Sequence, residues 1–170
     1  EYSNPKTIGN MTFSQKIMAS VFQSVTSRSA GANSINQSAL HSNSKIVTIA
    51  LMFIGGSPGG TAGGIKTVTL TVLVLAVMCV TKGKNKIEAF GKSISFYTLQ
   101  RSLAIAFFNF VIILGSTFLL NALNKNFGFL DVLFEVASAV GTVGLGLGLS
   151  SGTSVFCKLI LCVDMILRSE

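Results

Sequence analysis

The residues of this sequence best suited to chemistry form a short glycine-containing segment in which backbone oxygens would bind a ligand. A dehydrated monovalent cation needs several oxygens at once to replace its water, and glycine lets successive carbonyls turn to one side. Thr142-Val143-Gly144 has the composition for this task. Residues 127–138 predict a short helix just before it, whose negative dipole end would point toward the ion. The segment is therefore a candidate cation-binding loop.

These glycines also permit other interpretations. One is a loop between packed helices, in which glycine allows two backbones to approach closely. Phosphate binding is disfavoured because a phosphate loop needs a Gly-Lys pair, and Ile65 separates Gly64 from Lys66. The glycines within residues 144–148 lack the third glycine and the preceding strand of a dinucleotide-binding fingerprint. No grouping of nucleophile, base and orienting acid is evident, so the sequence predicts no enzyme and no covalently bound cofactor.

Residues 55–64 form a second and denser glycine segment, with six glycines and Pro58. Proline removes a backbone donor and glycine is costly to order, so no helix continues through this segment. Apolar runs flank it at residues 46–54 and 68–80. If both flanks lie in a membrane, the freed amides and carbonyls must face protein or a water-filled cavity. The break therefore predicts a pore or a binding site nearby.

The composition predicts a membrane protein. The chain has 170 residues, of which 49% are hydrophobic and only 11% are charged, and its mean hydropathy is +0.66. The apolar run at residues 103–120 approaches the length of a bilayer span at about 1.5 Å per residue. The polar start and the abrupt apolar end predict a piece of a longer protein. The expected fold class is an all-α membrane protein.

The net charge of +7 raises the question of a nucleic-acid partner. Such a partner would need cations gathered on one solvated face with polar or aromatic readers between them. Many of the cations instead occupy one connection between apolar segments, as expected of a cytoplasmic loop. These residues are Lys82, Lys84, Lys86, Lys92 and Arg101. The sequence therefore predicts no nucleic-acid partner, and it places the connections around His41 and residues 124–126 outside.

The elements that position the two glycine segments follow one order twice. A short helix leads to small residues and then to a membrane helix, and Gly31 and Gly144 occupy equivalent places in the two units. The predicted order is a short helix at 13–25, a helix broken at 55–64 and resumed at 65–81, a full membrane helix at 99–123, a short helix at 127–138 and a last helix at 155–167. At about 1.5 Å per residue, the first helix is too short to cross a bilayer.

Three motifs resemble the superfamily of Trk, Ktr and HKT potassium transporters. Residues 55–66, Gly-Gly-Ser-Pro-Gly-Gly-Thr-Ala-Gly-Gly-Ile-Lys, look like the intramembrane loop of that superfamily. Ser-Arg28-Ser-Ala-Gly31 and Gly141-Thr-Val-Gly144-Leu resemble its third and fourth filter segments. The match covers nearly the whole chain. Three motifs in the right order are more specific than any single glycine run.

The resemblance implies helix/pore-helix/helix repeats with re-entrant filter loops and a broken helix, arranged as four repeats around a central pore. This chain would hold most of the third and fourth repeats. Potassium would be the transported ion, with Na⁺ dependence left open. The implied ion-filter residues are Ser29, Ala30, Gly31, Ala32, Thr142, Val143, Gly144 and Leu145.

The resemblance also implies a gate beneath the filter and a pore-facing charge. The implied gate-loop residues are Gly55, Gly56, Ser57, Gly59, Gly60, Thr61, Ala62, Gly63, Gly64 and Lys66. Arg168 would project toward the pore. A positive charge about 8 Å from a permeating cation raises the energy of that cation by about 2 kcal/mol at an effective dielectric of about 20. Asp164 is unusual in an apolar helix, and Arg168 four residues later is its nearest candidate partner. Pro58, Gly60 and Leu167 depart from the superfamily pattern.

The predicted organisation has three parts: residues 1–83 with the third pore helix, filter loop and broken helix, the basic cytoplasmic connection 84–101, and residues 102–170 with the fourth repeat. The resemblance implies a multi-pass protein of the cell membrane that contacts lipid, a homodimer of the full-length subunit and a cytoplasmic nucleotide-binding regulatory subunit. Two other hypotheses stay open. One is a secondary transporter that binds a small solute between broken helices, and the other is a nonconducting membrane scaffold.

Overall fold

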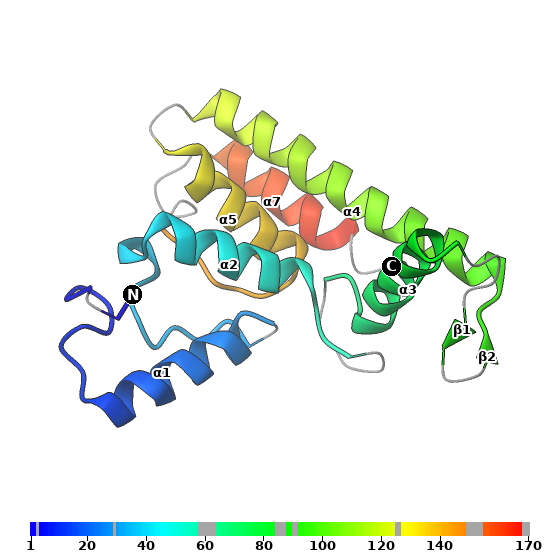
Figure 1. Cartoon of the computed structure of the whole chain (residues 1–170). Helices are drawn as coiled ribbons and strands as arrows, with labels where there is room; N and C mark the ends of the chain where they lie inside the picture. Colours follow the sequence, from blue (N-terminus) through cyan, green and yellow to red (C-terminus); the bar gives the residue numbers. More distant parts are fainter. Residues whose placement is uncertain are drawn as a thin grey trace.

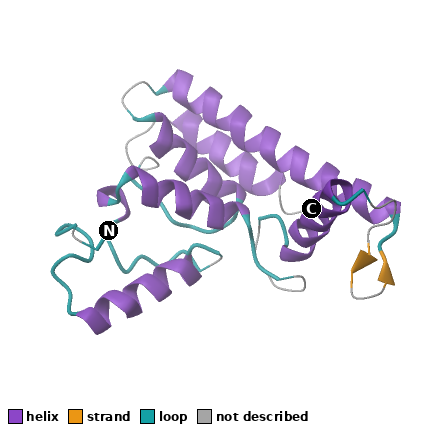
Figure 2. Cartoon of the chain, in the orientation of Figure 1, coloured by secondary structure: helices purple, strands orange, loops and turns teal. Residues whose placement is uncertain are grey.

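The computed structural model describes residues 1–2, 4–28, 30–57, 64–83, 88–89, 92–124, 127–148 and 155–167. Their regular elements are helices joined by loops, with one small pair of strands (Figures 1 and 2). The elements are α1 (Phe13–Thr26), the 3₁₀ turn η1 (Gln37–Ala39), α2 (Ser42–Phe53), α3 (Thr67–Thr81), the strands β1 (Glu88–Ala89) and β2 (Lys92–Ser93), α4 (Phe96–Leu123), α5 (Phe129–Val140) and α7 (Val155–Leu167). The expected all-α fold is confirmed.

Two details differ from the sequence-based expectation. The basic connection contains a small antiparallel pair, β1 and β2, in which Glu88 lies opposite Ser93. The full membrane helix α4 begins at Phe96, three residues before the expected start. Ser95 explains the earlier start, because its hydroxyl accepts a hydrogen bond from the backbone N–H of Tyr97 at 3.2 Å and so caps the helix.

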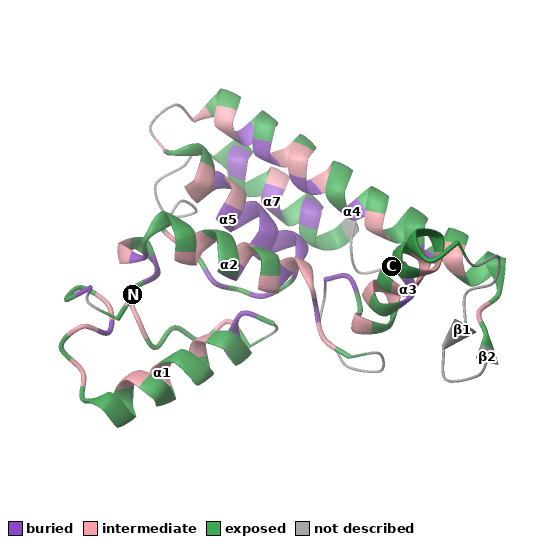
Figure 3. Ribbon diagram, in the orientation of Figure 1, coloured by how far each residue is buried: buried purple, intermediate pink, exposed green. Residues whose placement is uncertain are grey.

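The helix α4 has the length and composition of a membrane span. It contains 28 residues, whereas the apolar helix α3 is shorter. Of the described helices, α4 alone is both long enough and apolar enough to cross a membrane. Large apolar side chains on α4 are exposed in this chain. Phe107, Phe108, Phe110 and Phe118 are among them. Figure 3 shows exposed residues along the length of α4, with buried ones between them. Such a surface suits contact with lipid or with apolar protein.

The short helix α5 lies at the centre of the packing. It contacts α2, α4 and α7, and its residues from Phe134 to Val140 are all buried. One apolar cluster joins Val132 and Val136 of α5 to Leu120 of α4 and Cys157 of α7. A helix of 12 residues would be marginal alone, so burial on three sides is what stabilises α5. The element that precedes the candidate cation-binding loop is therefore held rigidly.

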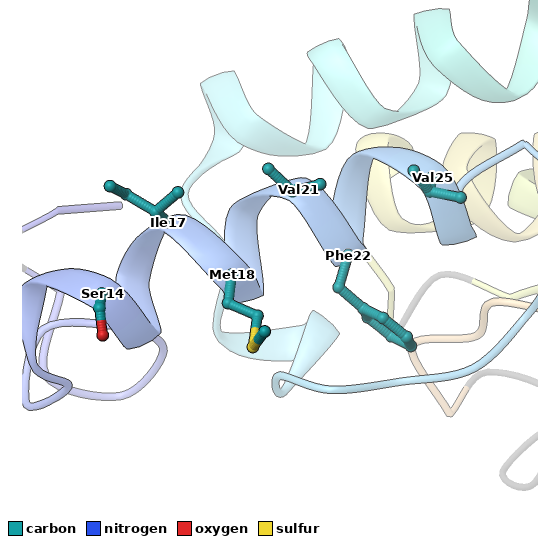
Figure 4. A pocket seen from close by; sticks show the side chains of 6 residues that line it. All are labelled: Ser14, Ile17, Met18, Val21, Phe22 and Val25. Carbon is teal, nitrogen blue, oxygen red and sulfur yellow. The ribbon is translucent and has the colours of Figure 1, made fainter.

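The helix α1 is packed differently, because its apolar side chains are exposed. Ile17, Met18, Val21, Phe22 and Val25 line an apolar groove together with Ser14 (Figure 4). Each of the five apolar side chains is exposed in this chain. An apolar helix face is stable only when lipid or other protein covers it.

A polar cluster joins the N-terminal segment to the start of α2. The Glu1 carboxylate accepts hydrogen bonds from the backbone N–H of His41 at 2.7 Å, from the Thr7 hydroxyl at 2.8 Å and from the Asn4 amide at 2.9 Å. Burial opposes ionisation of Glu1, but the hydrogen bonds, led by that of His41, outweigh it and lower the pKa of Glu1 to about 2. This carboxylate is therefore better stabilised in the folded protein than in the unfolded chain.

This shift predicts a pH-dependent contribution to stability. Because the folded pKa is below the ordinary value of 4.5, the contribution is present above pH 4.5 and is lost as the pH falls toward 2. Glu1→Gln in the full-length parent should lower the melting temperature at pH 7, and the difference should vanish over that acidic range. Thermal unfolding in detergent measures it, with the exposed Lys6→Gln as control. A difference that persists unchanged at the acidic end would contradict the role of Glu1.

Candidate functional site

The fold brings the two predicted filter segments into contact. Gly31 and Gly144 both have left-handed backbone conformations, with φ of +64° and +88°. A Cβ atom placed on Gly31 would lie 2.4 Å from the carbonyl oxygen of Val143 and 3.2 Å from the Cα atom of Gly144. A side chain at Gly31 would therefore collide with the backbone of the other segment. Only glycine allows this approach without displacement.

The fourth segment leaves α5 through a tight wrap. The backbone N–H groups of Gly141, Thr142 and Val143 donate to carbonyls of the last turn of α5, at 2.8, 3.0 and 2.9 Å. Thr142 has a φ of +51°, which is uncommon for a residue with a branched side chain and costs about 1–3 kcal/mol. Its hydroxyl donates to the carbonyl of Gly141 at 2.8 Å. The chain is thus turned sharply at the start of the segment.

Beyond that turn, alternate residues of the segment are buried. Val143 and Leu145 pack in an apolar cluster with Met52 of α2 and with Phe134 and Ala137 of α5. Thr142, Gly144 and Gly146 between them are exposed. The side chains of Val143 and Leu145 therefore anchor the segment, while the backbone between them lies open at the surface of this chain.

The carbonyls of these segments are available for a ligand. Within the described part of the chain, those of Ala30, Gly31 and residues 142–145 accept no hydrogen bond from another residue. The Ala32 carbonyl differs, because the buried Thr26 hydroxyl donates to it at 2.9 Å. Ser29 lies outside the described residues. Several neighbouring carbonyls without internal donors are suited to replace the water of a monovalent cation.

The described ends of the glycine-rich loop are joined to each other. The N–H of Gly55 donates to the carbonyl of Ile65 at 3.0 Å, the N–H of Ile65 donates to Phe53 at 2.9 Å, and the N–H of Thr67 donates to Gly56 at 3.3 Å. A Cβ atom on Gly64, whose φ is +78°, would lie 2.6 Å from the Cα atom of Gly55. These contacts form a stem, defined here as residues 53–56 and 64–67, that closes the loop.

The stem corrects one predicted boundary. The helix after the break was expected from Ile65, but α3 begins at Thr67 because Ile65 is hydrogen-bonded within the stem. Lys66 is exposed at the N-cap of α3. The other predicted gate-loop residues in the interval 58–63 lie outside the described part, namely Gly59, Gly60, Thr61, Ala62 and Gly63.

Met52 connects the stem to the fourth filter segment. Its side chain is buried against Phe134 and Val143. Its carbonyl oxygen would lie 3.0 Å from a Cβ atom on Gly64 and 3.2 Å from one on Gly141. The end of α2 therefore touches both the closed end of the glycine-rich loop and the start of the candidate cation-binding segment.

Comparison with known proteins decides the family. A family model named TrkH and described as a cation transport protein matches residues 3–168. The chain belongs to this TrkH family. Ktr system potassium uptake protein B of Bacillus subtilis is 36% identical over 167 residues, which are 98% of this chain and 37% of that protein. The potassium/sodium uptake protein NtpJ of Enterococcus hirae is 36% identical over 161 residues, covering 93% of this chain and 36% of NtpJ.

A solved structure shows the same fold. The crystal structure of the potassium transporter TrkH from Vibrio parahaemolyticus matches with a TM-score of 0.78 at 19% sequence identity, covering 95% of this chain and 36% of that one. The expected resemblance to potassium transporters is therefore confirmed, and the family is one of membrane transporters rather than enzymes. The chain spans little more than a third of the length of these two curated relatives.

In this TrkH-family chain, the described residues give Asp164 a partner that the sequence did not indicate. The Ser116 hydroxyl of α4 donates to the Asp164 carboxylate of α7 at 2.8 Å. Asp164 is buried, so this bond also links the two helices. Arg168, the partner proposed from its spacing, lies outside the described residues, and its contact with Asp164 and its position toward the pore stay predictions.

Two acidic residues of α5 contribute contacts that sequence reasoning did not assign. Their spacing of four residues in an otherwise apolar helix was the available signal, but it could not reveal their partners. Asp131 accepts a hydrogen bond and ion pair from Lys45 of α2 at 2.6 Å. Glu135 accepts a hydrogen bond from the backbone N–H of Leu147 at 3.0 Å. The short helix is thereby connected to α2 and to the segment after Gly144.

The Lys45–Asp131 pair predicts a measurable coupling. The side chains are 12% and 34% exposed, so the pair is screened less than a surface salt bridge. Lys45→Met and Asp131→Asn in the full-length parent should each reduce stability by about 1–3 kcal/mol, because each leaves the partner without its hydrogen bond. The double variant should lose less than the sum of the two single losses. Chemical unfolding in detergent measures this cycle, and strictly additive losses would show that the pair contributes nothing.

Proposed function

We propose that this chain is part of the pore of a potassium transporter, in which backbone carbonyls beside Gly31 and Gly144 coordinate K⁺ during permeation. The observation that carries the proposal is the contact between two glycine segments far apart in the sequence, each preceded by a short helix. Their carbonyls replace part of the ion's water without adding charge. The relatives named as potassium uptake proteins support K⁺ as the ion, and the name of NtpJ keeps Na⁺ as a second candidate.

The glycine-rich loop at residues 55–64 acts as the gate in this proposal. Its stem holds both ends of the loop beside the end of α2. A rearrangement within the loop therefore changes the access of K⁺ to the pore without unfolding the flanking helices. Residues 1–83 and 102–170 would form two repeats of the pore, joined by the basic connection 84–101 on the cytoplasmic side. Because the chain spans little more than a third of its relatives, conduction needs the rest of the parent protein.

The same proposal predicts the membrane location and the partners of the protein. The protein is a multi-pass component of the cell membrane, and its exposed phenylalanines on α4 face lipid or a second subunit. The groove of α1 is covered by another part of the longer parent. The proposal retains the two partners that the family resemblance implies, a second copy of the full-length subunit in a homodimer and a cytoplasmic nucleotide-binding regulatory subunit.

Complementation tests the proposal. The full-length parent should restore growth of a cell deficient in K⁺ uptake at low external K⁺. Gly144→Ser should abolish that growth at an equal amount of membrane-inserted protein, because the residue has a left-handed φ and lies against Gly31. Unchanged K⁺ uptake in this variant would refute the filter. Uptake of an organic solute coupled to an ion would instead favour a secondary transporter.

A further inference from the structure

Glu135 is a buried carboxylate directly behind the fourth filter segment. Its side chain is on α5, six residues before Gly141, and the residue is only 6% exposed. One carboxylate oxygen accepts the hydrogen bond from the N–H of Leu147 at 3.0 Å. The same oxygen would lie 3.4 Å from a Cβ atom on Gly146. The carboxylate is therefore in contact with the backbone two to three residues beyond Gly144.

A carboxylate at this place is costly unless it is bonded. Its neighbours in α5 are the fully buried Phe134 and Val136, and burial of a charge among apolar groups is strongly unfavourable without a donor. A hydrogen bond from a backbone N–H to a carboxylate is charge-assisted and stronger than one between neutral groups. Within the described residues, the N–H groups of Gly144, Leu145 and Gly146 make no hydrogen bond. The hydrogen bond at Leu147 therefore holds the backbone just after three residues whose N–H groups are not hydrogen-bonded.

The third filter segment is held by different chemistry. Phe22 stands nine residues before Gly31, as Glu135 stands nine residues before Gly144, so α1 has no acid at the equivalent place. There the Thr26 hydroxyl donates to the carbonyl of Ala32 instead. A carboxylate that accepts from a backbone N–H leaves the carbonyls of its segment free, whereas the hydroxyl occupies one of them. The arrangement at Glu135 is thus specific to the fourth segment.

We propose that Glu135 is a positioning residue of the filter, which holds the segment after Gly144 in register through its hydrogen bond with Leu147 and so sets the spacing of the carbonyls at residues 142–145. This inference rests on the proposed function. Val143 and Leu145 fix the segment by packing on one side, and Glu135 fixes its downstream end. Loss of the bond lets the carbonyls spread, which weakens discrimination between K⁺ and Na⁺ more than it weakens transport itself.

Three substitutions in the full-length parent separate the hydrogen bond from the charge. Glu135→Gln keeps an oxygen acceptor of the same reach without the charge, Glu135→Asp keeps the charge on a side chain one methylene shorter, and Glu135→Ala removes both. The readout is the ratio of the KM values for K⁺ and Na⁺ uptake in cells lacking other K⁺ uptake, at matched membrane levels. Asp131→Ala, one turn earlier on α5 and paired with Lys45, is the matched control.

Glu135→Ala and Glu135→Asp should reduce the preference for K⁺ about tenfold, which corresponds to about 1.4 kcal/mol. Glu135→Gln and Asp131→Ala should keep that preference within about twofold. If wild-type uptake is normal, the inference would be overturned by an unchanged preference for K⁺ in Glu135→Asp or by a full loss of that preference in Glu135→Gln. A wild-type parent that takes up no K⁺ would overturn the proposed function, and this inference with it.

Discussion

Replacement of Gly31 by alanine in the full-length parent should reduce K⁺ uptake at least about tenfold. The added Cβ would lie 2.4 Å from the carbonyl oxygen of Val143, and φ is +64°, where a residue with a Cβ costs about 1–2 kcal/mol. The contact is with backbone, so no side-chain rotation relieves it. The two predicted filter segments must separate, and the carbonyls that we propose to coordinate one ion together no longer reach it. Initial rates of K⁺ uptake into K⁺-depleted cells measure this loss.

Gly83 supplies a matched control for that experiment. Its φ is +63°, nearly the same as that of Gly31, but a Cβ atom on Gly83 would meet nothing within 4 Å. Gly83→Ala therefore imposes a similar backbone penalty in the connection after α3, away from the filter segments. Its uptake should stay within about twofold of wild type. If both variants lost uptake equally, the effect would be one of general stability, and the contact between filter segments would not explain it.

The second large effect is expected from shortening the glycine-rich loop. Removal of residues 58–63 should raise passive K⁺ flux about tenfold, as expected when a barrier falls by about 1.4 kcal/mol. The ends of the loop already meet, since a Cβ atom on Gly64 would lie 2.6 Å from the Cα atom of Gly55. A short connection can therefore close the stem and keep its hydrogen bonds while the obstruction is lost. Efflux from K⁺-loaded proteoliposomes containing the purified parent measures the change.

A replacement of equal length tests whether the loop itself is the obstruction. When residues 58–63 are replaced by six glycine and serine residues, the stem and the length of the loop are both kept. This variant should remain far less leaky than the shortened one. If the shortened protein inserts normally and its flux is unchanged or reduced, the loop is no gate. If both variants leak equally, the side chains at 58–63 matter more than the length of the loop.

The sequence was sufficient for the elements and motifs whose signals are local. Glycine density at residues 55–64 predicted the helix break, because a backbone of that composition cannot continue an α-helix. The long apolar run predicted α4, and the repeated order of short helix and glycine pointed to Gly31 and Gly144. The start of α3 was misplaced by two residues, since the hydrogen bonds of Ile65 with the opposite side of the stem have no local signature.

The partners of charged residues could not be predicted in the same way. Arg168 was the nearest residue in sequence that could pair with Asp164, but a hydroxyl on another helix, that of Ser116, lies within hydrogen-bond distance. Asp131 and Glu135 share one helix face and looked alike, yet one binds Lys45 and the other binds the backbone of Leu147. Such pairings depend on how helices pack, which a pattern within one helix does not specify.

By itself, the sequence determined the class of membrane protein, the family resemblance and the glycines that a re-entrant backbone requires, because conformational preference and hydrophobicity belong to each residue and its neighbours. Only the tertiary structure decided that Gly31 meets the carbonyl of Val143, that the glycine-rich loop is closed by a stem, and that Glu135 accepts a hydrogen bond from Leu147. Those contacts join residues distant in the chain. The position of Glu135 depends on the packing of α5 against α2, α4 and α7, and the stem depends on how the end of α2 meets the start of α3.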